Sequence, residues 1–133
     1  MTHRENKLIF PSAEGFPFSN AIRAGDFVYV SGQIAFLPDG TISTGAIEVQ
    51  TKIVLDTLQS ILAQAGCTIT DVVKCGCTLQ DARDFDAFNK IYATYFLKNP
   101  PVRTTAVVQH VLDARVEIDC IAYKPLSHER PYS

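Results

Sequence analysis

An arginine in the last third of the chain has the surroundings of a substrate-binding side chain. Arg103 follows Pro100 and Pro101 and precedes the apolar run Ala106-Val107-Val108. Its planar guanidinium suits a carboxylate, with which it can form two parallel hydrogen bonds. An arginine that extends into solvent, or that pairs with a neighbouring subunit, is an equally good interpretation of the same residues.

Three other polar residues could take part in chemistry. Asp119 lies among apolar neighbours, where it could orient a water or pair with a cation such as Arg115 or Lys74. Ser31 could act as a nucleophile, but no histidine is an obvious partner for it. We interpret His110 as a solvated loop residue, because a single histidine is weak support for acid–base catalysis.

The common motifs for nucleotide, phosphate or serine chemistry are absent from the sequence. It contains no G-x-S-x-G, no P-loop and no G-x-G-x-x-G. Cys75-Gly76-Cys77 lacks the C-x-x-C spacing of zinc sites, and its two thiols share one face of an expected strand. We therefore expect core cysteines and no metal.

Composition excludes several classes of partner. The 133 residues carry a formal charge of −2, and their lysines and arginines are scattered rather than gathered in a basic stripe. Nucleic acids and anionic membranes are therefore poor candidate partners. The apolar runs are too short to span a bilayer, and the first residues lack the apolar region of a secretory signal. We expect a cytoplasmic protein.

Apolar periodicity and turn residues predict the elements that position these side chains. The expected elements are a short strand at 8–10, a hairpin of 21–24 and 27–33, helices at 47–65 and 81–97, and strands at 71–79, 104–108 and 115–123. Gly32 suggests a bulge or a close backbone approach in the hairpin. In the strand at 71–79, Val73, Cys75, Cys77 and Leu79 are expected on the buried face.

The order ββαβαββ predicts an α+β fold with two helices on one face of a sheet. One domain spans residues 1–133, with its core at about 18–124 and flexible segments at 1–7 and 126–133. The other sheet face stays apolar around Phe27 and Tyr29, and uncovered apolar faces usually mark interfaces. We therefore expect a homo-oligomer.

Four stretches, taken together, resemble the reactive-intermediate imine/enamine deaminase family, the Rid or YjgF-like proteins also known as endoribonuclease L-PSP. The stretches are Gly25-Asp26-Phe27-Val28-Tyr29-Val30-Ser31-Gly32-Gln33, Asn89 ahead of Tyr92, Pro101-Val102-Arg103, and Val116-Glu117-Ile118-Asp119-Cys120-Ile121-Ala122. They occur in the family's order and span about residues 18–124.

The resemblance implies a chorismate-mutase-like subunit with a mixed sheet, assembled as a homotrimer with sites in the clefts between subunits. It implies that Arg103 binds the substrate carboxylate and that Asp119 stands where a glutamate helps to hold the attacking water. The other substrate-binding positions that it implies are Phe18, Ser31, Gly32, Asn89 and Thr105.

The implied reaction is the hydrolysis of small 2-imino or enamine acids, such as 2-iminobutanoate and 2-iminopropanoate, to 2-keto acids and ammonia without a cofactor. The chain departs from the family at three positions: Phe18 replaces a tyrosine, Thr105 a cysteine and Asp119 a glutamate. A more apolar pocket at Phe18 would suit a bulkier imino acid. The alternative interpretation is a non-catalytic trimer that binds small carboxylates in a regulatory or protective role. A ribonuclease role ranks last, because the chain is acidic.

Overall fold

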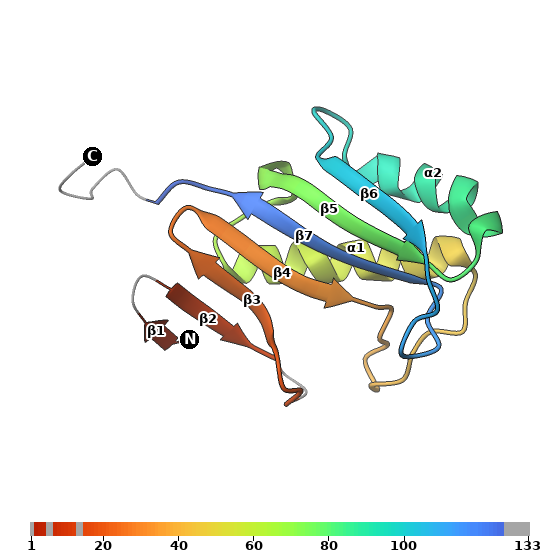
Figure 1. Cartoon of the computed structure of the whole chain (residues 1–133), viewed down its shortest axis with the longest axis horizontal. Helices are drawn as coiled ribbons and strands as arrows, with labels where there is room; N and C mark the ends of the chain where they lie inside the picture. The colour runs from red at the N-terminus through yellow and green to blue at the C-terminus, as the bar shows by residue number, and fades with distance from the viewer. Residues whose placement is uncertain (1, 5–6, 13–14, 127–133) are drawn as a thin grey trace.

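One seven-stranded sheet, with two helices packed on one of its faces, forms the framework of the protein (Figure 1). The structure is a computed structural model that describes residues 2–4, 7–12 and 15–126. The elements are β1 (Thr2–Arg4), β2 (Lys7–Pro11), β3 (Ser19–Ala24), β4 (Phe27–Gln33), α1 (Ile47–Gln64), β5 (Val72–Leu79), α2 (Phe85–Tyr95), β6 (Val102–Val107) and β7 (Val116–Tyr123). The predicted α+β class is confirmed.

The strands lie in the order β1-β2-β3-β4-β7-β5-β6. Only the β5–β6 pair among these described strands is parallel, so the sheet is mixed. The predicted ββαβαββ order begins at β3, and β1 and β2 extend the sheet beyond it. The start of the chain at 1–7, which we expected to be flexible, includes strand residues 2–4 and 7. The expected flexible end at 126–133 lies outside the described residues, apart from residue 126 itself.

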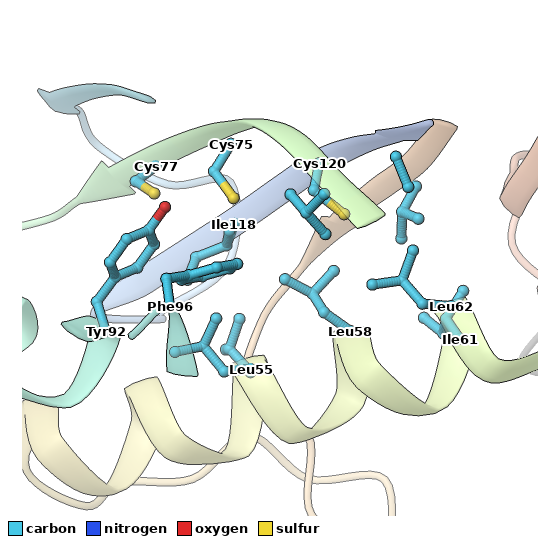
Figure 2. Packing of buried hydrophobic residues seen from close by; sticks show 14 of the residues in the cluster. Leu55, Leu58, Ile61, Leu62, Cys75, Cys77, Tyr92, Phe96, Ile118 and Cys120 are labelled. Atoms are coloured by element: carbon cyan, nitrogen blue, oxygen red, sulfur yellow. The ribbon is translucent and has the colours of Figure 1, made fainter. Parts of the chain in front are cut away.

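The core lies between the sheet and α1, whose apolar residues recur every three or four positions as predicted. Figure 2 shows Leu55, Leu58 and Leu62 of α1 facing Cys75 of β5 and Ile118 of β7. These side chains are almost completely buried. A single apolar stripe is enough to fix α1 against the sheet, since burial of such side chains contributes about 1.5–3 kcal/mol each.

The second helix contributes aromatic rings to the same core. Phe88 and Tyr92 are buried, and the helix ends at Tyr95, slightly before the predicted end at 97. In β5 the prediction that Val73 is buried was wrong. A register shift between Val72 and Lys74 turns Val72 inward and leaves Val73 43% exposed.

The sheet face opposite the helices, here called the open face, carries exposed aromatic rings. Phe27 and Tyr29 of β4 and Tyr123 of β7 lie on it and are 40%, 47% and 44% exposed. The expected homo-oligomer would cover these rings. No helix within the described residues is both long and apolar enough to cross a bilayer.

Candidate functional site

A cavity of about 240 Å³ opens where the chain enters β3 and where β4 and β7 lie side by side. Its lining consists of Phe16, Phe18, Gly32, Ile34, Phe36, His110, Val111, Leu112 and Glu117. The rings of Phe16 and Phe18 stack with their centroids 5.5 Å apart. The wall is thus mainly aromatic and aliphatic, with Glu117 as its one carboxylate.

The position of Glu117 depends on the absence of a side chain at Gly32. A register shift between Val30 and Gln33 brings Gly32 against β7, as the predicted bulge or close approach requires. A Cβ atom on residue 32 would lie 2.6 Å from Oε2 of Glu117. Glu117 is half-buried, and no hydrogen bond or ion pair holds its carboxylate within the described residues. The carboxylate is free to accept a proton or a hydrogen bond from a bound molecule.

Asp119, which the sequence suggested as the carboxylate that holds water, is not part of this cavity. It lies two residues beyond Glu117 on the same strand face, but it is exposed and packs over Gly76 of β5. A Cβ atom on residue 76 would lie 2.7 Å from Oδ1 of Asp119. Of the two carboxylates, only Glu117 lies with Phe18 and Gly32.

Arg103 lies in a second cluster, on β6. Its guanidinium carbon is 4.7 Å from the ring centroid of Tyr92, 5.4 Å from that of Phe88 and 5.8 Å from that of Phe85. The guanidinium carbon is thus within cation–π distance of all three rings. No carboxylate in the described part of the chain pairs with it, so its hydrogen-bonding edge is available to an anion.

Three buried polar atoms without hydrogen-bond partners belong to the same region of β6 and α2. They are Oδ1 of Asn89, the hydroxyl oxygen of Tyr92 and Oγ1 of Thr105. Buried polar atoms nearly always have partners in native proteins. Their presence beside an unpaired arginine therefore points to a polar ligand, and the sequence had selected Asn89, Arg103 and Thr105 for such a site.

The two clusters lie on opposite faces of the sheet. In the sheet, Arg103 of β6 is the register partner of Cys75 of β5, and Cys75 is the partner of Cys120 of β7. Both cysteines face the helices, so Arg103 does too. Glu117 of β7 is the partner of Thr78 of β5, and both occupy the alternate strand positions, which face the open side. One copy of the chain therefore does not bring Arg103 and Glu117 into a single pocket.

Ser31, another expected site residue, has a structural contact. Its hydroxyl donates a hydrogen bond to the carbonyl oxygen of Ser19, across the β3–β4 hairpin. This bond holds the start of β3 beside the bulge at Gly32. The structure thus places Ser31 next to the cavity but outside its lining.

His110 lies in a loop, as we interpreted it, but it lines the cavity and is hydrogen-bonded rather than solvated. Its Nδ1 lies 2.7 Å from the carbonyl oxygen of Ala114, and its Nε2 lies 2.8 Å from Oγ1 of Thr78. A carbonyl oxygen only accepts, so Nδ1 carries a proton, and in the neutral ring Nε2 accepts from the threonine. Thr78 lies opposite Glu117 in the β5–β7 ladder. No sequence motif pointed to this arrangement.

The cysteines are buried thiols, as expected. Burial raises the pKa of Cys77 to about 12 and also raises the pKa of Cys75 and Cys120. Figure 2 shows the Tyr92 hydroxyl directed toward this group. Across the described residues, no three metal-binding side chains gather in a way that could hold an ion.

Known proteins with similar sequences identify the family. Residues 11–124 match the family model described as Endoribonuclease L-PSP. The chain belongs to the Endoribonuclease L-PSP family. The resemblance to Rid and YjgF-like proteins noted in the sequence is thereby confirmed.

Two relatives of the chain carry names that describe an activity, and a third carries only a family name. A human relative named 2-iminobutanoate/2-iminopropanoate deaminase is 37% identical over 84% of this chain and 82% of its own length. The chloroplastic Reactive Intermediate Deaminase A of Arabidopsis thaliana is 40% identical over 84% of this chain and 60% of its own length. A RutC family protein of Pyrococcus abyssi is 40% identical over 81% of this chain and 87% of its own length.

Solved structures of the Endoribonuclease L-PSP family have the same fold. The crystal structure of yeast Mmf1 is 32% identical, with a TM-score of 0.80 over 87% of this chain and 93% of that one. A structure from Thermotoga maritima is 35% identical, with a TM-score of 0.81 over 88% of this chain and 93% of that one. The mixed α+β architecture is therefore that of the family.

Proposed function

We propose that the protein is a cofactor-independent deaminase that hydrolyses 2-imino and enamine acids to 2-keto acids and ammonia. The observation that carries this proposal is the unpaired guanidinium of Arg103, stacked on the rings of α2 beside the unpartnered atoms of Asn89 and Thr105. A site of this kind suits a small carboxylate with further polar atoms. The names of the human and Arabidopsis relatives support the same chemistry.

In this proposal Arg103 binds the substrate carboxylate with its two-pronged edge. The rings behind the guanidinium limit its motion, so little side-chain freedom is lost when the substrate binds. The Asn89 amide and the Thr105 hydroxyl can donate to the carboxylate, and their oxygens can accept from the protonated imine nitrogen. By binding the carboxylate, Arg103 thereby fixes the position of C2 of the substrate within the site.

Glu117 is the proposed base that activates the attacking water. The protonated imine is already electrophilic, so the site needs a positioned water rather than a strong nucleophile. Glu117 accepts a proton as the water oxygen bonds to C2, which gives a carbinolamine. The nitrogen then takes up that proton from Glu117, the C2–N bond breaks, and the proton of the C2 hydroxyl passes to the departing ammonia. The products are the keto acid and an ammonium ion, and Glu117 is again ionised. Water and the imino acid account for every atom of the products.

The complete site is proposed to form between copies of the chain. β6 is one of the two edge strands of the sheet, and no described strand pairs with its outer edge, so the Arg103 cluster can approach a neighbouring copy. The Glu117 cavity lies on the open face, which a neighbour can cover. Contact between the edge of one copy and the open face of the next can close into a ring. A homotrimer, as the resemblance implies, has three such sites.

The test couples the purified protein to a threonine dehydratase and traps the free imine with semicarbazide. The proposal predicts faster keto-acid release and less semicarbazone with the wild-type protein, and loss of the effect in Arg103→Ala. Binding of a 2-keto acid with no acceleration would instead support the non-catalytic binder.

A further inference from the structure

The cavity beside Glu117 is larger and more apolar than a small imino acid requires. Six of its nine lining residues carry large apolar side chains, three of them phenylalanines, and no lysine or arginine is among the nine. The substrate carboxylate therefore has no partner here and belongs at Arg103. The part of the substrate that enters this cavity is C2 and the side chain attached to it.

The cavity of one copy sets an upper bound on the size of that side chain, because a neighbouring copy on the open face takes up part of its volume. About 240 Å³ holds no more than roughly eight water-sized groups at about 30 Å³ each. The methyl side chain of 2-iminopropanoate has one heavy atom and the ethyl side chain of 2-iminobutanoate has two, so either contacts only a small part of the apolar lining. An isobutyl group has four heavy atoms and a benzyl group has seven, and both stay within this bound while contacting more of the lining.

The rim supplies a surface for such a group. Phe16 and Phe18 are 43% and 50% exposed, and their stacked planes are within 10° of parallel. A ligand side chain placed against them buries apolar surface on both partners, and an aromatic one can extend the stack. The phenylalanine at position 18, where the family resemblance implies a tyrosine, removes a hydroxyl that would otherwise require a partner.

We propose that the preferred substrates are 2-imino acids with bulky apolar side chains, from isobutyl to benzyl, an inference that rests on the proposed deaminase function. Water loss from serine or threonine supplies only methyl and ethyl imines. A bulky apolar imine needs an amino acid that is oxidised at C2, where the amine loses two electrons and two protons. A flavin-dependent amino-acid oxidase, which passes those electrons to oxygen and forms hydrogen peroxide, belongs to the class of reaction that supplies it.

The experiment generates three imines with D-amino-acid oxidase and catalase from D-alanine, D-leucine and D-phenylalanine. Because C2 of the imine is flat, the configuration of the amino acid does not matter. At matched oxidation rates, the protein competes with semicarbazide for each imine. The decrease in semicarbazone formation caused by the protein gives its kcat/KM for that imine. We expect the leucine and phenylalanine imines to exceed the alanine imine by at least about tenfold, since one methylene in an apolar pocket changes specificity by about 10-fold or more.

A pair of variants tests whether the cavity is responsible. Phe18→Ala should reduce the phenylalanine-to-alanine ratio by about tenfold or more. Val73→Ala, at an exposed valine of β5 outside the cavity lining, should leave the ratio unchanged. Equal rates for the three imines, or a preference for the alanine imine, would overturn the inference while the deaminase proposal stands. Acceleration of none of them would overturn both.

Discussion

Two glycines provide a direct comparison of the two candidate carboxylates. Gly32 packs beneath Glu117 and Gly76 packs beneath Asp119, each on the strand next to β7. A methyl group at residue 32 would lie 2.6 Å from Oε2 of Glu117, and one at residue 76 would lie 2.7 Å from Oδ1 of Asp119. Each alanine substitution therefore displaces one carboxylate and leaves the other in place.

The size of the effect follows from the displacement. Nonbonded heavy atoms sit comfortably at about 3.5 Å or more, so Gly32→Ala moves the Glu117 carboxylate by roughly 1 Å. A misplacement of about 1 Å can reduce a rate about a hundredfold. We expect Gly32→Ala to lower kcat/KM by about this factor. Gly76→Ala should change it by less than about threefold, because exposed Asp119 can turn into solvent.

The assay is the coupled imine-trapping measurement, with thermal unfolding to check that both variants are folded. Glu117→Gln keeps the shape of the side chain and removes the base, so it should cost about 10²–10⁴ in kcat/KM. Asp119→Asn should retain nearly full activity. If Gly76→Ala and Asp119→Asn lose activity while Gly32→Ala and Glu117→Gln keep it, Asp119 is the active carboxylate and the assignment to Glu117 is refuted.

Three further predictions concern the anchor, the histidine and the thiols. Arg103→Lys keeps the charge but loses the two-pronged edge, so KM should rise by about 10–100-fold; an unchanged KM would contradict the anchor. His110→Asn removes the bonds to Thr78 and Ala114, so urea unfolding should show a loss of about 1–2 kcal/mol and kcat/KM should fall; full stability would count against this bracing role. Burial raises the pKa of the Cys77 thiol from 9.0 to about 12, so the unfolded chain loses this proton at a lower pH than the folded chain does. The free energy of unfolding should therefore decrease as pH rises above 9. A urea midpoint that does not change between pH 8 and 10.5 would contradict this prediction.

The elements around the site follow from local sequence patterns. The stripe of α1 repeats every three or four residues, and the alternation of Val116, Ile118 and Cys120 in β7 matches a strand with one buried face. Arg103 was recognisable because the preceding prolines make it an unusual start to an apolar strand. These signals depend only on neighbours along the chain, so they are present in the sequence itself.

The features that the sequence did not reveal depend on contacts between distant residues. Glu117 and Asp119 share a strand face, and alternation cannot tell which of them meets the bulge at Gly32. Their separation is set by the register between β4 and β7. The role of His110 likewise depends on Thr78, which is 32 residues away in the chain. The strand β1 is polar and pairs through its backbone, so it carried no apolar signal.

Arg103 of one copy and Glu117 of another are proposed to complete each site, and mixed oligomers test this proposal directly. Arg103→Ala and Glu117→Gln subunits, each inactive alone, are unfolded together in equal amounts and refolded. In a ring where each site takes its arginine from one copy and its glutamate from the next, each of the two is intact in about half of the cases. About a quarter of the sites therefore have both residues intact. We predict recovery of about a quarter of wild-type activity. Mixed oligomers that stay inactive would contradict a site shared between copies.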